Sequence, residues 1–283
     1  MKSTLSILCL LFALVISCGT QDKKSLVEKI QGKKTDTVAD SLKIRVLKEY
    51  YSNGKVKTET EAKGSLRHGL MKSYNREGQL LSQVNYVNNV REGMATNFYP
   101  LTGKVNSTLI YINGIKEGDE IWYYENIEQP FRVSPFIKGR IEGIQKYYFE
   151  DGKLMAEIPY KNGFPGKGLK EYKKDGTLIT DYPKLIINQK DHLAQANKVI
   201  LSIELSDPNT EVKFYRGSLT EGKYLNDDLF ELATQYGTTQ IDFNVPPGST
   251  LNQKVTITAS YKTKYGIPQV LSRTYNLNVT NNK

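Results

Sequence analysis

The side chains that most often carry out chemistry in proteins are sparse in this chain. Its 283 residues include two histidines, His68 and His192, and two cysteines, Cys9 and Cys18. Neither histidine has a second metal ligand at a typical spacing. The serine-hydrolase, HExxH and phosphate-loop patterns are absent from the sequence. We therefore expect no enzyme activity, no cofactor and no metal site.

Cys18 is the residue whose surroundings predict a covalent modification. A lysine at position 2 and an apolar run from Leu5 to Ile16 precede it, and this run is too short to span a bilayer as a helix. The sequence Val-Ile-Ser-Cys that ends at Cys18 is similar to a bacterial lipobox. We expect residues 1–17 to be a lipoprotein signal peptide and Cys18 to carry palmitate-type acyl chains. The alternative is an ordinary signal peptide that happens to contain a cysteine.

The expected lipid anchor also predicts the location of the protein. Several acyl chains on one residue hold a protein stably on a membrane. Gly19, rather than an aspartate, follows Cys18, which permits sorting to the outer membrane of a two-membrane bacterium. The net charge of +9 favours anionic surfaces, but the basic residues are dispersed, which argues against nucleic acid. We expect an outer-membrane protein that faces the periplasm or the cell surface.

Residues 18–45 are polar and poor in aromatic side chains, which is typical of a flexible tether. Within this tether, Thr37 and Ser41 each follow an aspartate and precede an aliphatic residue. That pattern is similar to the O-glycosylation motif of Bacteroidota, so both are candidate glycosylation sites. Chance occurrence of so short a motif is the alternative.

A pattern with a period of 24 or 25 residues runs from about position 48 to 182. Tyrosines mark each unit, at Tyr50, Tyr74, Tyr99, Tyr124, Tyr148 and Tyr172. In the fifth unit, Asp151-Gly152 predicts a two-residue hairpin turn, and Asn162-Gly163 turns the chain toward the next unit. A lone hairpin cannot bury its apolar face. We therefore expect residues 46–184 to form a solenoid of stacked hairpins, as a single curled antiparallel sheet.

The repeated unit resembles the MORN repeat, in the variant found in bacterial proteins of the YwqK type. Segments 86–93, 111–118 and 136–143 share the frame that carries this likeness. The resemblance covers about half of the chain and implies a β-hairpin solenoid used for protein or membrane contact, without catalytic chemistry. The fourth unit departs most, because Glu128 replaces a glycine, and its hairpin tip is expected to be longer or irregular.

From Leu185 onward the repeat stops and longer alternating strands follow, for example over 199–205 and 255–261. Turn clusters rich in Pro, Gly and Asn separate them. About seven strands in roughly a hundred residues, without a helical pattern, favour an immunoglobulin-like or fibronectin-like β-sandwich over 185–283. The whole chain is therefore expected to be all-β.

An aromatic row is the candidate for partner binding. Neighbouring residues of a strand point to opposite faces, and Phe98, Tyr123 and Tyr147 directly precede the repeated tyrosines of the middle units. If those tyrosines face the core, these three form a ladder on the wet face, where aromatic clusters mark partner surfaces. The alternative is that the sandwich domain or a loop covers that face.

Together these features predict a non-catalytic, lipid-anchored envelope protein of the Bacteroidota type. We expect it to act as an interaction scaffold or accessory subunit of an outer-membrane protein complex, with envelope proteins as partners. A carbohydrate- or lipid-binding surface module is the alternative.

Overall fold

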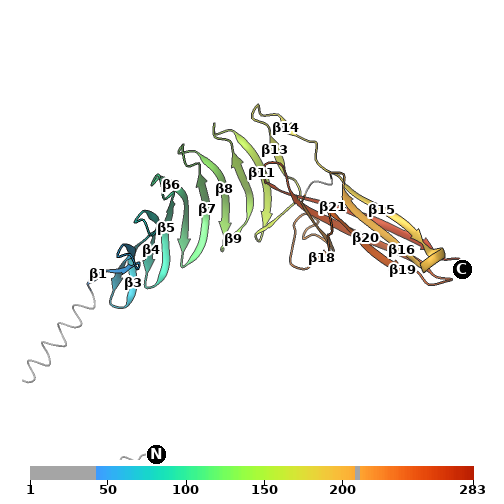
Figure 1. The fold of residues 1–283 in the computed structure, drawn as a ribbon, viewed down its shortest axis with the longest axis horizontal. Coiled ribbons are helices and arrows are strands. Elements are labelled where there is room, and N and C mark those ends of the chain that lie inside the picture. The colour runs from blue at the N-terminus through green and yellow to red at the C-terminus, as the bar shows by residue number, and fades with distance from the viewer. Residues whose placement is uncertain (1–42, 208–210) are drawn as a thin grey trace, which may run out of the picture.

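The computed structural model describes residues 43–207 and 211–283, which form an all-β protein (Figure 1). The predicted signal peptide lies outside the described residues, and so do Cys18, Thr37 and Ser41. In the part of the chain that is described, no helix is long and apolar enough to cross a membrane.

The first half of the described chain is one antiparallel sheet of 14 strands, most of which pair with their neighbours in sequence. It begins at Ile44, two residues before the start expected for the solenoid. Its strands are β1 (Ile44–Tyr50), β2 (Val56–Lys63), β3 (Leu66–Tyr74), β4 (Leu80–Val87), β5 (Val90–Phe98), β6 (Val105–Ile112), β7 (Ile115–Tyr123), β8 (Pro130–Ile137), β9 (Arg140–Ile141), β10 (Gly143–Tyr148), β11 (Leu154–Lys161), β12 (Phe164–Pro165), β13 (Lys170–Tyr172) and β14 (Leu178–Ile179).

Short turns connect the units as the sequence predicts. Lys161 pairs with Phe164 across the turn at Asn162 and Gly163, and these two residues have φ angles of 53° and 85°. Positive φ at both central positions is the type I′ geometry, whose twist matches that of the flanking strands. The predicted Asn-Gly turn is confirmed.

The hairpin tips are longer than the Asp-Gly pair predicts. Tyr148 pairs with Leu154 across the tip of the fifth unit. The Phe149 N–H donates to the carbonyl of Lys153 at 2.9 Å. The Lys153 N–H donates to the Asp151 carboxylate at 3.1 Å. The expected two-residue turn is wrong here, because the aspartate side chain supports a wider turn by binding the backbone two residues on.

The third and fourth tips contain one residue more than the others. In the first unit, Tyr51 N–H bonds the carbonyl four residues ahead, at Lys55. In the third unit, Tyr99 N–H bonds the carbonyl of Lys104, and in the fourth, Tyr124 N–H bonds that of Gln129. The expected longer tip of the fourth unit is confirmed, and the third unit shares it.

The hairpin sheet is open, with β1 at one end of the strand order and β14 at the other. The curling that we expected is not confirmed. Each hairpin adds to the previous one in sequence order, so no strand returns to pair with β1 within the described residues.

The C-terminal region contains a three-stranded sheet, ordered β15-β16-β19, and a four-stranded sheet, ordered β18-β17-β20-β21. Leu201 and Ile203 of the first sheet share one hydrophobic core with Phe214, Ile257 and Leu277 of the second. The elements are β15 (Leu185–His192), α2 (Leu193–Ala196), β16 (Lys198–Leu205), β17 (Val212–Arg216), β18 (Phe230–Leu232), β19 (Thr238–Asn244), β20 (Thr250–Lys262) and β21 (Pro268–Thr280).

Candidate interaction surface

The two faces of the hairpin sheet differ in exposure. Thr60, Met71, Val84 and Ala95 lie opposite one another on consecutive strands, and directly paired residues point to the same face. This row and its equivalents define the recessed face. Its buried members are Thr58, Thr60, Ala62, Tyr86, Ala95, Ser107, Leu109, Tyr111, Glu120, Ser134, Gln145, Ala156, Ile158, Tyr160 and Glu171.

The opposite side, which we call the open face, carries well-exposed aliphatic side chains. Met94 and Ile110 pair across β5 and β6 and are 59% and 45% exposed. Ile112 and Ile115 flank the next short turn and are also exposed. The exposed aliphatic residues of this face include Ile44, Val46, Leu66, Val87, Val90, Met94, Ile110, Ile112, Ile115, Ile137, Ile144 and Leu178. Contiguous apolar surface of this kind marks interaction sites.

The three residues of the predicted aromatic ladder do not occupy equivalent positions. Phe98 and Tyr123 end β5 and β7, each directly after a shift in strand register. In β10 the equivalent residue is Tyr148, while Tyr147 lies one position earlier. The extra residue in the third and fourth tips causes this offset, because it moves the marker tyrosines of those units out of the strands.

Tyr147 lies on the recessed face. It pairs with Ala156, which is fully buried, and its hydroxyl donates to Oε1 of Gln145 at 2.9 Å. It also packs against a cluster that includes Ile267 of the C-terminal region. Tyr147 therefore belongs to the recessed face, where Ile267 of the C-terminal region packs with the same cluster.

Phe98 and Tyr123 take the position of Tyr74, which lies on the open face. The Tyr74 hydroxyl donates to the Glu59 carboxylate at 2.8 Å, and Glu59 alternates with the recessed Thr58 along β2. The aromatic row of the open face is Tyr50, Tyr74, Phe98, Tyr123, Tyr148 and Tyr172.

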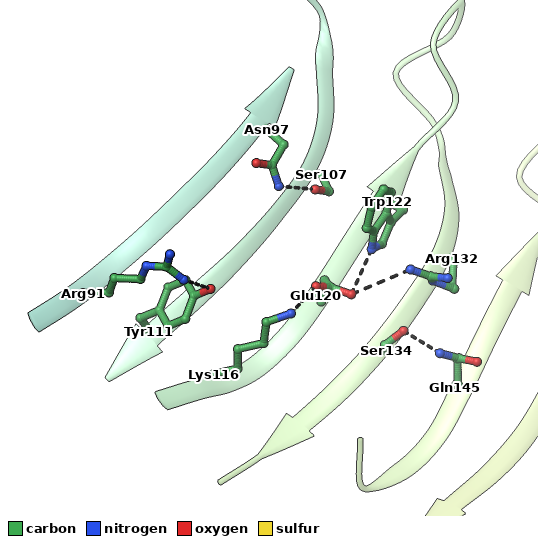
Figure 2. Close-up of polar contacts among 10 residues, drawn as sticks. All are labelled: Arg91, Asn97, Ser107, Tyr111, Lys116, Glu120, Trp122, Arg132, Ser134 and Gln145. Atoms are coloured by element: carbon green, nitrogen blue, oxygen red, sulfur yellow. Dashed lines mark hydrogen bonds and ion pairs between the residues drawn. The ribbon is translucent and has the colours of Figure 1, made fainter. Parts of the chain in front are cut away.

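Figure 2 shows several groups of bonded polar side chains on the recessed face of the middle strands. The Glu120 carboxylate accepts hydrogen bonds from Lys116 Nζ at 2.8 Å and Trp122 Nε1 at 2.9 Å, and an Arg132 guanidinium nitrogen lies 3.7 Å away. Burial alone would raise the pKa of Glu120. The hydrogen bonds from Lys116 and Trp122 outweigh that effect, so the pKa lies below its ordinary value.

The remaining polar groups of this face bond one another in the same way. Gln145 Nε2 donates to Ser134 Oγ at 2.7 Å, and Asn97 Nδ2 donates to Ser107 Oγ at 2.8 Å (Figure 2). Next to them, basic groups stack on the aromatic row of the recessed face: Arg67 on Tyr86, Arg91 on Tyr111 and Lys116 on Phe136. Most of these groups bond one another, and Arg132 Nε is buried without a hydrogen-bond partner among the described residues. The recessed face is therefore built largely as structure rather than as a convergent ligand site.

The connection between β20 and β21 docks on the recessed face of the last repeats. Ile267 is 1% exposed and packs with Ala156 and Ile158. The buried Glu171 carboxylate accepts hydrogen bonds from Thr263 Oγ1 at 2.5 Å and from the Tyr182 hydroxyl at 3.1 Å. The C-terminal region thus covers β11 and β13, while the open face carries the exposed row.

The histidines show no shared site. His68 lies in β3, with Nδ1 3.2 Å from Oδ1 of Asn88 in the neighbouring turn, and His192 ends β15. Within residues 43–207 and 211–283, no group of three or more histidine, cysteine or acidic side chains is placed to hold a metal.

The exposed aliphatic row is the feature that sequence reasoning missed. Its signal was available, since valine or isoleucine flanks the short turns at Val87, Val90, Ile112 and Ile115. The repeat tyrosines drew attention to the other end of each strand instead.

Comparison with known proteins identifies the repeats. Residues 46–63, 67–88 and 141–162 match the family described as MORN repeat variant, and no curated protein matches the chain. One solved structure, the extracellular domain of a one-component system from B. thetaiotaomicron, is similar at 11% identity with a TM-score of 0.21. That similarity covers 83% of this chain and 30% of the other. MORN-variant repeats are thus present in the hairpin sheet, over β1 to β4 and over β10 and β11.

Proposed function

We propose that this protein is a non-catalytic interaction scaffold of the bacterial envelope, anchored by lipid on Cys18 in the outer membrane, where it serves as an accessory subunit of a protein complex. The observation that carries the proposal is the open face, where exposed aliphatic side chains recur between β1 and β10. Its MORN-variant repeats are, in this proposal, of the YwqK type.

The chemistry of the open face favours a protein partner. Sites for small polar ligands place a few hydrogen-bonding groups within a concave pocket. The aliphatic row instead presents Val, Ile and Met side chains on successive strands, which lie about 4.8 Å apart. Such a regular apolar strip fits an extended partner with a repeating apolar side.

The C-terminal region belongs to the same proposal as an immunoglobulin-like or fibronectin-like sandwich. One core that joins a three-stranded and a four-stranded sheet supports this assignment. Its role would be to fix the last repeats through the contact of Ile267 with Ala156 and Ile158.

A pull-down of the tagged full chain from its own membranes in mild detergent tests the proposal. Stoichiometric recovery of envelope proteins is expected, and the double substitution Met94→Glu and Ile110→Glu should reduce it at least about tenfold, because two charges would be buried in an apolar contact. Leu101→Glu is the matched control, since Leu101 is 86% exposed but lies in a hairpin tip. Equal recovery with all variants would contradict the proposal.

A carbohydrate- or lipid-binding module is the second candidate, and the aromatic row of the open face favours it. Aromatic rings offer flat apolar surfaces to sugar rings or acyl chains. Here Tyr123→Ala should abolish binding to glycans or vesicles while the chain stays folded, whereas Tyr147→Ala should lower thermal stability. Unchanged binding by the Tyr123 variant would remove this candidate.

A further inference from the structure

The hairpin sheet has one long free edge. All seven residues of β1 are exposed, and β1 pairs with β2 alone among the described strands. The other end of the strand order, β14, spans only Leu178–Ile179. An edge strand presents a row of unpaired backbone N–H and C=O groups, which another strand can bind.

Of the usual devices that protect an edge, β1 has charged side chains, at Arg45, Lys48 and Glu49, and these can pair with a matching strand. The strand contains neither proline nor glycine. It exposes Ile44, Val46, Leu47 and Tyr50, by 58%, 56%, 44% and 58%. Long, apolar and exposed edges favour strand addition, so β1 is built to be covered.

The sequence of β1 is complementary to itself. We propose that β1 pairs antiparallel with β1 of a second copy of this chain, about a two-fold axis at Leu47. In this register Arg45 lies opposite Glu49 of the second copy, and the symmetry repeats the pair on the other side of the axis. Ile44 then lies opposite Tyr50, and all seven residues have partners.

Neighbouring registers are less favourable. When the axis moves by one residue, the partner that each residue faces on the second copy moves by two positions. Each side chain therefore still faces a residue on the same side of the sheet. An axis at Lys48 sets two lysines directly opposite each other, and like charges so placed are destabilising. An axis at Val46 places Arg45 opposite Leu47 and leaves Tyr50 without a partner.

The groups that surround the proposed pairs are compatible with them. Arg45 already donates one hydrogen bond to the Gly64 carbonyl at 2.9 Å, and a guanidinium has further donors free. Lys48 is neutralised on its own chain by Glu59 at 2.8 Å, so it can lie opposite Val46 without an unpaired charge. A two-fold axis through Leu47 is perpendicular to the sheet, and it places the open faces of both copies on one side.

Sedimentation equilibrium of the full chain in detergent, over a range of concentrations, tests this pairing. The wild-type chain should form dimers. Arg45→Glu and Glu49→Arg should each raise the dissociation constant about tenfold or more, because each sets two like-charged pairs opposite each other. The double variant with both substitutions should restore the dimer, since the charges are only exchanged.

Amide hydrogen exchange locates the contact. Exchange in residues 44–50 should slow as the concentration rises, while exchange at Leu178 and Ile179 should not change. A chain that stays monomeric at about 100 μM would overturn the proposal. That concentration corresponds to an association free energy of about −5.5 kcal/mol. A dimer that is insensitive to the two charge reversals, or one that the double variant fails to restore, would also overturn the proposal.

Discussion

At the scale of single residues, Glu120 joins Lys116, Trp122 and Arg132 on the recessed face. Its carboxylate takes hydrogen bonds from both Lys116 and Trp122, and its side chain is 10% exposed. Hydrogen bonds to a charged group contribute about 1.5–3 kcal/mol each. Glu120→Gln should therefore lower the free energy of unfolding by about 2 kcal/mol at pH 7 in denaturant titrations.

The pH dependence of this effect has a definite sign. A carboxyl whose pKa is lowered by folding stabilises the fold above its ordinary pKa of 4.5, and this contribution is lost as the pH falls through the folded value. The Glu120→Gln variant has no carboxyl at this position, so its free energy of unfolding should not show this loss as the pH falls. Glu157→Gln serves as control, because its ion pair with Lys146 spans 4.0 Å at a partly exposed site and contributes about 0–1 kcal/mol. Identical acid profiles for wild type and Glu120→Gln would contradict the assignment.

Tyr261 is the opposite case, because within the described residues its buried hydroxyl contributes no hydrogen bond to the stability of the fold. The side chain is 4% exposed, and its hydroxyl has no hydrogen-bond partner. Burial, followed by the charges of Glu171 and Asp207, raises its pKa to about 12. The neutral form is favoured in the fold, so its contribution is complete below the ordinary value of 10 and is lost as the pH rises toward 12.

Tyr261→Phe should therefore be neutral or stabilising by about 1 kcal/mol at pH 7, since it removes an unsatisfied buried group. The variant should also lose less stability between pH 10 and 12 than the wild type. Thermal unfolding followed by circular dichroism across this range measures both effects. A clear destabilisation at pH 7 would show that the hydroxyl is satisfied in solution.

At the scale of elements, the glycines that lie within the strand bulges are not equivalent. Gly69 and Gly93 occupy matching positions in β3 and β5, with φ of 110° and 77°. A Cβ at Gly69 would lie 2.1 Å from Glu61 Oε2, whereas one at Gly93 would meet nothing within 4 Å. That Glu61 oxygen accepts the N–H of Leu70 at 2.7 Å, so a substitution would break this bond.

Gly93→Ala should cost about 1–2 kcal/mol from backbone strain alone. Gly69→Ala should cost about 1–2 kcal/mol more, because Glu61 must also leave the Leu70 N–H. Chemical denaturation of the two variants gives the difference directly. Equal losses would mean that the Glu61 contact is dispensable.

The elements also show how far the sequence could be read. Asn162 and Gly163 specify their turn locally, because both tolerate positive φ, and that turn was predictable. The alignment of Phe98, Tyr123 and Tyr147 was not. The aromatic pairs Phe98-Tyr99 and Tyr147-Tyr148 look alike in sequence. Because the third tip contains one added residue, the strand ends at the first member of the pair, Phe98, in β5 but at the second member, Tyr148, in β10.

At the scale of the whole molecule, the exposure of the two faces depends on partners far away in sequence, which no local pattern reveals. The recessed face of β11 is covered by Ile267, a residue more than a hundred positions later. Phe149 and Tyr265 add an edge-on ring contact at 6.3 Å, and Thr263 binds the buried Glu171. The hairpin sheet and the C-terminal region should therefore unfold as coupled units.

Trp122 makes this coupling measurable, because it is the sole tryptophan of the chain and lies in β7 of the hairpin sheet. Ile267→Ala should cost about 2–5 kcal/mol, as other buried Ile→Ala changes do, and should lower the unfolding midpoint reported by Trp122 fluorescence. Tyr236→Ala, at a side chain that is 90% exposed, should leave it unchanged. A Trp122 midpoint that ignores Ile267→Ala would show that the two regions unfold independently, and the docked connection would then be a contact without a stabilising role for the repeats.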